Sequence, residues 1–301
     1  MAATREERTA STPTTVPRMG EPDTRHAPHT PRTGGAEIAA PVGVPEPRSV
    51  GIVGRGRVGT ALARAFREAG FAVDGPAGRG EVPFGEAVLL CVPDAEIPAA
   101  AAVVAGARCA RLVGHASGAT PLSVLEPARR AGTGLFGLHP LQTFSGAVAP
   151  VLAGAGCAIA GSTPAATAAA AGLARRLGME PLEVAEGRRA TYHAAASIAS
   201  NFLVTLEATA EAVAAGAGLA REDARALLVP LVRQTVDNWA AVGPERALTG
   251  PVARGDEPAV TSQRRAVAAV DPGLLALFDA LVERTRSLAA APARPSLEAA
   301  A

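Results

Sequence analysis

The sequence has no lysine, and all 29 of its basic residues are arginines. This absence excludes enzymes whose chemistry needs a lysine amine, such as P-loop nucleotide hydrolases and enzymes that hold pyridoxal phosphate as a Schiff base. An excess of charge is missing too, because 28 acidic residues leave a formal net charge of +1. No global field therefore attracts the chain to nucleic acid or to an anionic membrane, and we expect neither as a partner.

Long apolar runs and paired cysteines are also lacking. No apolar stretch approaches the roughly 18 uninterrupted residues of a membrane-spanning helix. The three cysteines, Cys91, Cys109 and Cys157, are scattered and form no C-x-x-C pair. This pattern favours buried thiols in a reducing cytoplasm over a disulfide framework or a zinc site. We therefore expect a cytoplasmic protein without a metal site.

Large apolar residues are nearly absent from residues 1–47, which are rich in Thr, Pro, Arg and Ala. Such a segment cannot bury enough surface to offset the entropy of ordering it, so we predict a disordered tail. The segment also lacks the apolar core of a signal peptide. A transit peptide is the alternative, but its acidic residues count against it. Residues 291–301 are predicted to be a second disordered tail.

What the sequence does contain is a nucleotide-binding pattern. The apolar run SVGIVG (49–54) is typical of a buried strand, and GRGRVG then places Gly54, Gly56 and Gly59 in G-x-G-x-x-G spacing. Apolar residues at helical spacing follow as far as Ala69. In this context the glycines would make a tight turn, admit a pyrophosphate and let the helix pack on the strand. The alternative is a glycine-rich turn that binds nothing.

The choice between NAD and NADP depends on where the second strand ends. Asp74 lies twenty residues after Gly54, where an acid could bind the ribose hydroxyls of NAD. If the strand continues past Asp74, Arg79 stands at its end and could pair with a 2′-phosphate. We predict NADP, with NAD as the alternative. The predicted cofactor contacts are Gly54, Arg55, Gly56, Arg57, Val58, Gly59, Arg79, Val92 and Pro93.

Further apolar runs predict an α/β Rossmann-type doubly wound sheet over residues 48–186. The runs at 87–94, 110–119 and 134–144 end near Pro93, Ser117–Gly118 and His139. Ligands of open α/β sheets bind at the carboxyl ends of the strands, so these residues are expected at one edge. Two more strands, at 156–161 and 180–185, flank a predicted helix at 164–177 and would complete the sheet.

The second half, residues 187–290, predicts an all-α domain. A helix is expected from Arg188 to about Ala215, with a packing face that includes Tyr192 and Phe202. Another is expected near 221–240, kinked by Pro230, and a loop at 248–256. A last helix is expected from Asp271, as N-cap, to about Leu288.

Together the strings GIVGRGRVG, CVPD, GHASGA, GLHPLQTF, YHAAASIASN and LTGPVARGD resemble a bacterial family. Its members join a Rossmann-like domain to a helical C-terminal domain of unknown function, and they are similar to pyrroline-5-carboxylate reductase. More remotely they are similar to ketopantoate reductase and the β-hydroxyacid dehydrogenases, which use a lysine near the start of the long helix. The resemblance implies an NAD(P)-dependent oxidoreductase with a 6-phosphogluconate dehydrogenase C-terminal-like helical domain that forms a homodimer.

Reduction of a small carbonyl or imine needs a proton donor beside the nicotinamide. The predicted catalytic residues are His193, His139, Ser117 and Asn201. His193 or His139 would donate the proton, while Ser117 and Asn201 would position the substrate and Arg189 would contact an anion at the cleft mouth. The alternatives are histidines that only bond to backbone, a non-catalytic nucleotide sensor, and a deazaflavin-dependent oxidoreductase.

Overall fold

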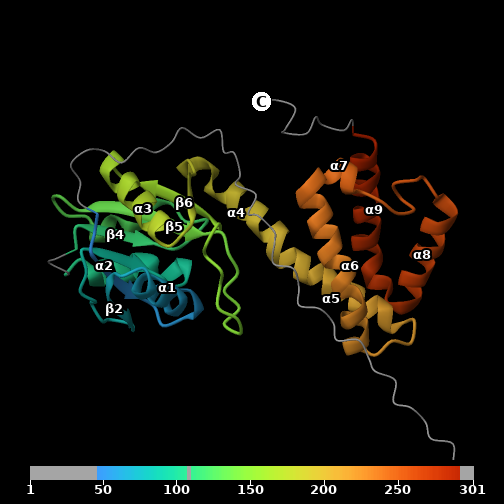
Figure 1. The fold of residues 1–301 in the computed structure, drawn as a ribbon, viewed down its shortest axis with the longest axis horizontal. Helices are drawn as coiled ribbons and strands as arrows, with labels where there is room; N and C mark the ends of the chain where they lie inside the picture. Colours follow the sequence, from blue (N-terminus) through green and yellow to red (C-terminus); the bar gives the residue numbers. More distant parts are fainter. Residues whose placement is uncertain (1–45, 107–109, 292–301) are drawn as a thin grey trace, which may run out of the picture.

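The computed structural model describes residues 46–106 and 110–291. Figure 1 shows two lobes, a sheet lobe and a helical lobe, joined by a long helical segment. A mostly parallel sheet with helices precedes an all-helical region, which confirms the expected fold class. Most of the two predicted tails, and Cys109, lie outside the described residues, whereas Cys91 and Cys157 are free thiols.

The sheet lobe contains seven strands in the order β2-β1-β3-β4-β5-β6-β7. All neighbouring strands pair in parallel except β5 and β6. Because β1 lies between β2 and β3, the chain reverses direction across the sheet at β1, where open α/β sheets bind ligands. The strands are β1 (Ser49–Val53), β2 (Ala72–Ala77), β3 (Ala87–Leu90), β4 (Leu112–His115), β5 (Gly134–Pro140), β6 (Gly156–Gly161) and β7 (Glu180–Glu183).

Helices cover both faces of this sheet, so its central strands are apolar on both sides. On one face lie α1 (Arg57–Glu68) and α3 (Pro164–Arg176), whose buried side chains share a core with Phe136. On the other lie α2 (Ile97–Val104) and a 3₁₀ segment (Leu122–Ala128). Each large apolar side chain buried here contributes about 2 kcal/mol, which holds the strand ends in fixed positions.

The segment that joins the lobes is one continuous helical rod, close to the helix expected from Arg188 to Ala215. It consists of α4 (Arg189–Ser197), a π-helical turn (Ile198–Phe202) and α5 (Leu203–Ala215). The π turn was not predicted. Phe202, expected on the packing face of this helix, is 56% exposed within this chain, so its packing against a partner stays a prediction. Phe202 lies in the π turn, where the regular helical spacing used for the prediction does not apply.

The helical lobe contains α6 (Arg221–Val242), α7 (Pro244–Ala247), α8 (Glu257–Val270) and α9 (Leu275–Ala289). Helix α6 continues through Pro230. The predicted last helix is present, and the Asp271 carboxylate accepts a hydrogen bond from the Gly273 amide at its start. Among the described residues, no helix is long and apolar enough to cross a membrane.

Candidate functional site

The glycine loop after β1 shows which of its glycines the fold itself requires. Gly54 has φ +111°, and a Cβ there would collide with the Cys91 carbonyl oxygen. A Cβ on Gly59 would collide with the Gly54 carbonyl oxygen. A Cβ on Gly56, in contrast, would have no neighbour within 4 Å. The protein alone therefore does not need glycine at position 56, whereas close approach of a ligand backbone or phosphate would.

Helix α1 begins immediately after this loop, with Gly56 as its N-cap. The first amides of a helix have no partner within the helix, and the helix dipole makes this end positive. Neither a capping side chain nor an acidic residue in the first turn occupies the end of α1. The loop and α1 together therefore form a site suited to an anion.

Beside the loop lies a cavity of about 480 Å³, which we call the nucleotide pocket. It is of the size found for small-molecule sites. Six of the predicted cofactor contacts line it: Gly54, Arg55, Gly56, Arg79, Val92 and Pro93. It is also lined by small apolar residues of α2, Ala99, Ala100 and Val103, which suit a flat aromatic base better than a charged group.

The remaining predicted contacts lie elsewhere. Arg57 lines a neighbouring cavity of about 460 Å³, and its Nη1 donates to the Ser145 carbonyl oxygen at 3.4 Å. Val58 packs against the core, and Gly59 lies against the turn at Gly54. These two are therefore positioned to support the loop by packing.

Asp74 lies in the middle of β2, and its carboxylate accepts a hydrogen bond from the Phe84 amide at 2.7 Å. It does not line the nucleotide pocket. The strand continues to Ala77, so Arg79, two residues further on, stands at the strand end. The geometry thus favours the interpretation in which the strand passes Asp74.

A second group of side chains gathers where β4, β5 and α4 meet. It contains three histidines, His115, His139 and His193, which we call the histidine cluster. The rings of His139 and His193 are 5.8 Å apart between centroids. A Cβ on Gly118 would lie 2.7 Å from His193 Cδ2 and 2.8 Å from His139 Nε2. The two predicted proton donors and the Gly118 loop therefore come together.

The protonation of His139 follows from its neighbour Tyr192. Burial raises the pKa of Tyr192 to about 12, so its hydroxyl stays protonated at neutral pH. This hydroxyl lies 3.0 Å from His139 Nδ1, and a phenol that donates there leaves the imidazole proton on Nε2, the atom beside Gly118. Burial, followed by electrostatic interaction with the neighbouring His193 and Arg189 side chains, lowers the pKa of His139 to about 4.

His115 is fully buried, and its Nδ1 accepts a hydrogen bond from the Ser117 amide at 3.2 Å. Burial and the charge of Arg189 lower its pKa to about 4 as well. Two members of the histidine cluster are thus neutral imidazoles at neutral pH. Of these two neutral rings, His139 is the one in contact with the His193 ring, whereas His115 is fully buried.

Arg189 fixes the start of α4 to the loop after β4. Its Nη2 donates to the Ser117 carbonyl oxygen at 2.8 Å, and its Nη1 lies 3.7 Å from Glu186. Glu186 in turn accepts from the Leu122 amide. Only 1% of Arg189 is exposed, so it does not lie at the cleft mouth as expected, whereas its contact with an anion stays a prediction. Sequence periodicity could not show that the side chain of this first helical residue reaches the loop after β4.

The other predicted catalytic residues take different positions. The Ser117 hydroxyl donates to Asp94 Oδ2 at 2.9 Å and accepts from the Thr120 amide at 3.1 Å, so it shapes the loop that carries Gly118. Asn201 is exposed in the π turn, eight residues beyond His193, or about 12 Å along a helix. Sequence reasoning gave Tyr192 a packing role, and the only signal for its contact with His139 was its place next to His193.

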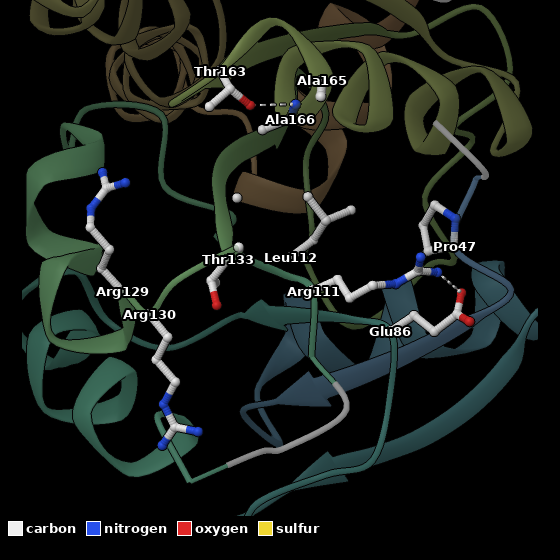
Figure 2. A pocket seen from close by; sticks show the side chains of 12 residues that line it. Pro47, Glu86, Arg111, Leu112, Arg129, Arg130, Thr133, Thr163, Ala165 and Ala166 are labelled. Atoms are coloured by element: carbon white, nitrogen blue, oxygen red, sulfur yellow. Dashed lines mark hydrogen bonds and ion pairs between the residues drawn. The ribbon is translucent and has the colours of Figure 1, made fainter. Parts of the chain in front are cut away.

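A further cavity of about 430 Å³ lies at the opposite edge of the sheet, near the starts of β4 and β5. Figure 2 shows Arg111 turned toward Glu86, while Arg129 and Arg130 extend in opposite directions. Arg129 is paired with Glu126. Because these arginines do not converge on one point, this cavity is a weaker candidate than the edge that carries the glycine loop and the histidine cluster.

Comparison with known proteins supports this description of the fold. Residues 155–285 match the family described as "Domain of unknown function (DUF2520)". This region begins at the last strands of the sheet and ends within α9. The expected resemblance, a Rossmann-like sheet followed by a helical domain of unknown function, is thereby confirmed. No curated protein matches the sequence.

Several solved structures share the fold. A "putative NADP oxidoreductase" from Bacteroides fragilis is 21% identical, with a TM-score of 0.67, covering 80% of this chain and 98% of that one. Pyrroline carboxylate reductase from Plasmodium falciparum, solved with NADP bound, is 11% identical, with a TM-score of 0.53 and the same coverage. A reductive aminase from Aspergillus terreus in complex with NADPH and ethyl levulinate is 17% identical, with a TM-score of 0.57 and the same coverage.

Proposed function

We propose that this chain is an NAD(P)-dependent oxidoreductase that reduces a small carbonyl or imine substrate, with bound NADPH supplying the hydride. One observation supports this most directly. The glycine loop, whose Gly56 the protein alone does not require, lies at the same sheet edge as the histidine cluster. A cofactor site next to hydrogen-bonding imidazoles is the arrangement that carbonyl or imine reduction needs.

Most of the residues proposed to hold the cofactor line the nucleotide pocket, and Arg57 lines the cavity next to it. The Gly54–Gly56 turn and the first amides of α1 would hold the pyrophosphate, and Arg57 would add positive charge nearby. Val92 and Pro93 would contact the adenosine side, and Arg79 would stand near its ribose. We propose NADP, with NAD as the alternative.

In the proposed mechanism, the two half-buried histidines act on the same substrate atom. His139, held as a neutral imidazole by Tyr192, would donate a hydrogen bond from Nε2 to the substrate oxygen or nitrogen. His193 would donate the proton as that atom becomes basic. The Ser117–Gly118 loop would limit how close the substrate comes to the rings. Asn201 would contact only a substrate that extends along the rod.

The experiment that tests this function uses Gly56→Ala. NADPH at millimolar concentration should raise the Tm of the wild type through mass action. Gly56→Ala should fold with a Tm within about 1 °C of the wild type, because nothing lies near the added methyl group, yet it should bind NADPH at least about tenfold more weakly. Differential scanning fluorimetry and fluorescence titration measure both quantities.

Gly187→Ala is a matched control, since a Cβ there also meets nothing within 4 Å and the residue lies away from the nucleotide pocket. It should bind NADPH like the wild type. If neither NADPH nor NADH stabilises the wild type, the proposed function is wrong. If they do, but no keto acid, aldehyde or imine oxidises the cofactor, a nucleotide sensor becomes the better explanation.

We also propose that the helical lobe forms a homodimer. Large apolar side chains are exposed along the rod and α6, among them Phe202 at 56%, Leu231 at 63% and Trp239 at 57%. Exposed apolar surface of this extent is typical of an interface. Leu231→Glu should convert a dimer into a monomer in light scattering after gel filtration. Arg233→Glu, two residues along the same helix, changes charge without removing an apolar contact and should leave the dimer largely intact.

A further inference from the structure

Two ion pairs flank the nucleotide pocket beyond the end of β2. Arg55 Nη2 lies 3.1 and 2.9 Å from the two carboxylate oxygens of Glu81. Arg79 Nη2 lies 2.9 Å from both carboxylate oxygens of Glu96. All four residues line the pocket. Both arginines that could bind a 2′-phosphate are therefore already paired with carboxylates.

The surroundings of Glu81 are those of a bound anion. Its Oε2 accepts a hydrogen bond from the Gly78 amide at 2.7 Å as well as from Arg55. A guanidinium and a backbone amide are the donors that phosphate groups use in proteins. Arg55 is itself held in place, because its Nε donates to the Pro76 carbonyl oxygen at 3.3 Å.

Gly78 makes this arrangement possible. A Cβ at this position would lie 3.1 Å from Arg55 Nη1, so the missing side chain lets the guanidinium lie directly over the end of β2. In a Rossmann fold the adenosine ribose lies at the end of this strand. Arg55, the residue between the first two glycines of the motif, thus spans the distance from the phosphate loop to the ribose end.

We propose that Glu81 determines the preference between the two dinucleotides, because its carboxylate occupies the place of the 2′-phosphate. This inference rests on the proposed function. NADPH must displace Glu81 from Arg55 and from the Gly78 amide before its 2′-phosphate can bind. NADH need not, since its 2′-hydroxyl can donate to the carboxylate, so Glu81 reduces the preference for NADP that Arg55 and Arg79 would otherwise give. Asp74, which bonds to the Phe84 amide, takes no part in this choice.

The test uses the two fragments 5′-AMP and 2′,5′-ADP (adenosine 2′,5′-bisphosphate), which differ only in the 2′-phosphate and need no substrate. Their Kd values are measured by calorimetry on the full chain, for wild type, Glu81→Gln and Glu126→Gln. Glu126 is a matched control, because its carboxylate pairs with Arg129 at 2.7 and 2.8 Å and its side chain is 52% exposed, against 54% for Glu81.

In Glu81→Gln the ratio of the two Kd values should shift toward 2′,5′-ADP by about tenfold, or roughly 1.4 kcal/mol, whereas Glu126→Gln should leave it unchanged. In a chain that already carries Arg55→Gln, adding Glu81→Gln should leave the ratio unchanged, because the Glu81 carboxylate affects the ratio through its pairing with Arg55. A ratio in Glu81→Gln that stays within about twofold of the wild type, or a shift that persists without Arg55, overturns the inference. If the wild type binds neither fragment nor NADPH, both this inference and the proposed function are wrong.

Discussion

Substituting Gly118 with alanine is expected to reduce turnover by about 100-fold while dinucleotide binding changes by less than about threefold. The added Cβ would lie 2.7 Å from His193 Cδ2 and 2.8 Å from His139 Nε2. Both rings must move, and misplacement of catalytic groups by about 1 Å has effects of this size. The nucleotide pocket, which these residues do not line, should remain intact.

The measurement is cofactor oxidation with a substrate found by screening, alongside NADPH titration of the same samples. Gly187→Ala, two residues before Arg189, controls for replacing a glycine near the start of α4, since it meets no atom within 4 Å. It should retain the turnover of the wild type. Normal turnover in Gly118→Ala would show that the geometry of His139 and His193 does not matter for the reaction.

The second large effect concerns stability at acidic pH. His115 and His139 have pKa values lowered to about 4, mainly by burial, whereas a histidine in the unfolded chain has a pKa near 6.5. Between these two values only the unfolded chain binds the protons. The free energy of unfolding should therefore fall as the pH drops from about 6.5 to about 4, by roughly 3 kcal/mol for each histidine.

Urea unfolding at several values between pH 7 and pH 4 measures this dependence. His139→Gln should be less stable than the wild type at pH 7, because Tyr192 loses its partner, but its stability should fall less steeply with acidification. A wild type and a variant with the same slope over this range would contradict the protonation states assigned to the histidine cluster.

The glycine motif and the apolar runs were sufficient to predict the sheet, because buried parallel strands and a strand–loop–helix turn leave local patterns. The same patterns indicated that Ser117, Gly118 and His139 share one edge. They could not show that β2 passes Asp74 and ends before Arg79, because strand ends depend on pairing with β1. They also could not show that Glu81 and Glu96 pair with the two arginines.

Tyr192 and His139, which are in contact, lie 53 residues apart in the sequence, so no local pattern encodes their contact. Burial of Arg189 is similar, since its hydrogen-bond acceptor, the Ser117 carbonyl oxygen, belongs to a residue 72 positions earlier in the sequence, and only Glu186 is local. What determines the chemistry of the site is thus the docking of α4 on the sheet edge. Sequence reasoning identified His193 and His139 as candidates, but the protonation of His139 depends on this docking.

The π turn at Ile198–Phe202 has a consequence for how this architecture can diversify. A π turn accommodates one residue more than the α-helical ladder, and each residue of an α-helix turns the chain by about 100°. Loss or gain of a single residue here would rotate the whole helical lobe against the sheet lobe without altering either one. The length of this short segment therefore determines which face of the helical lobe is turned toward the sheet lobe.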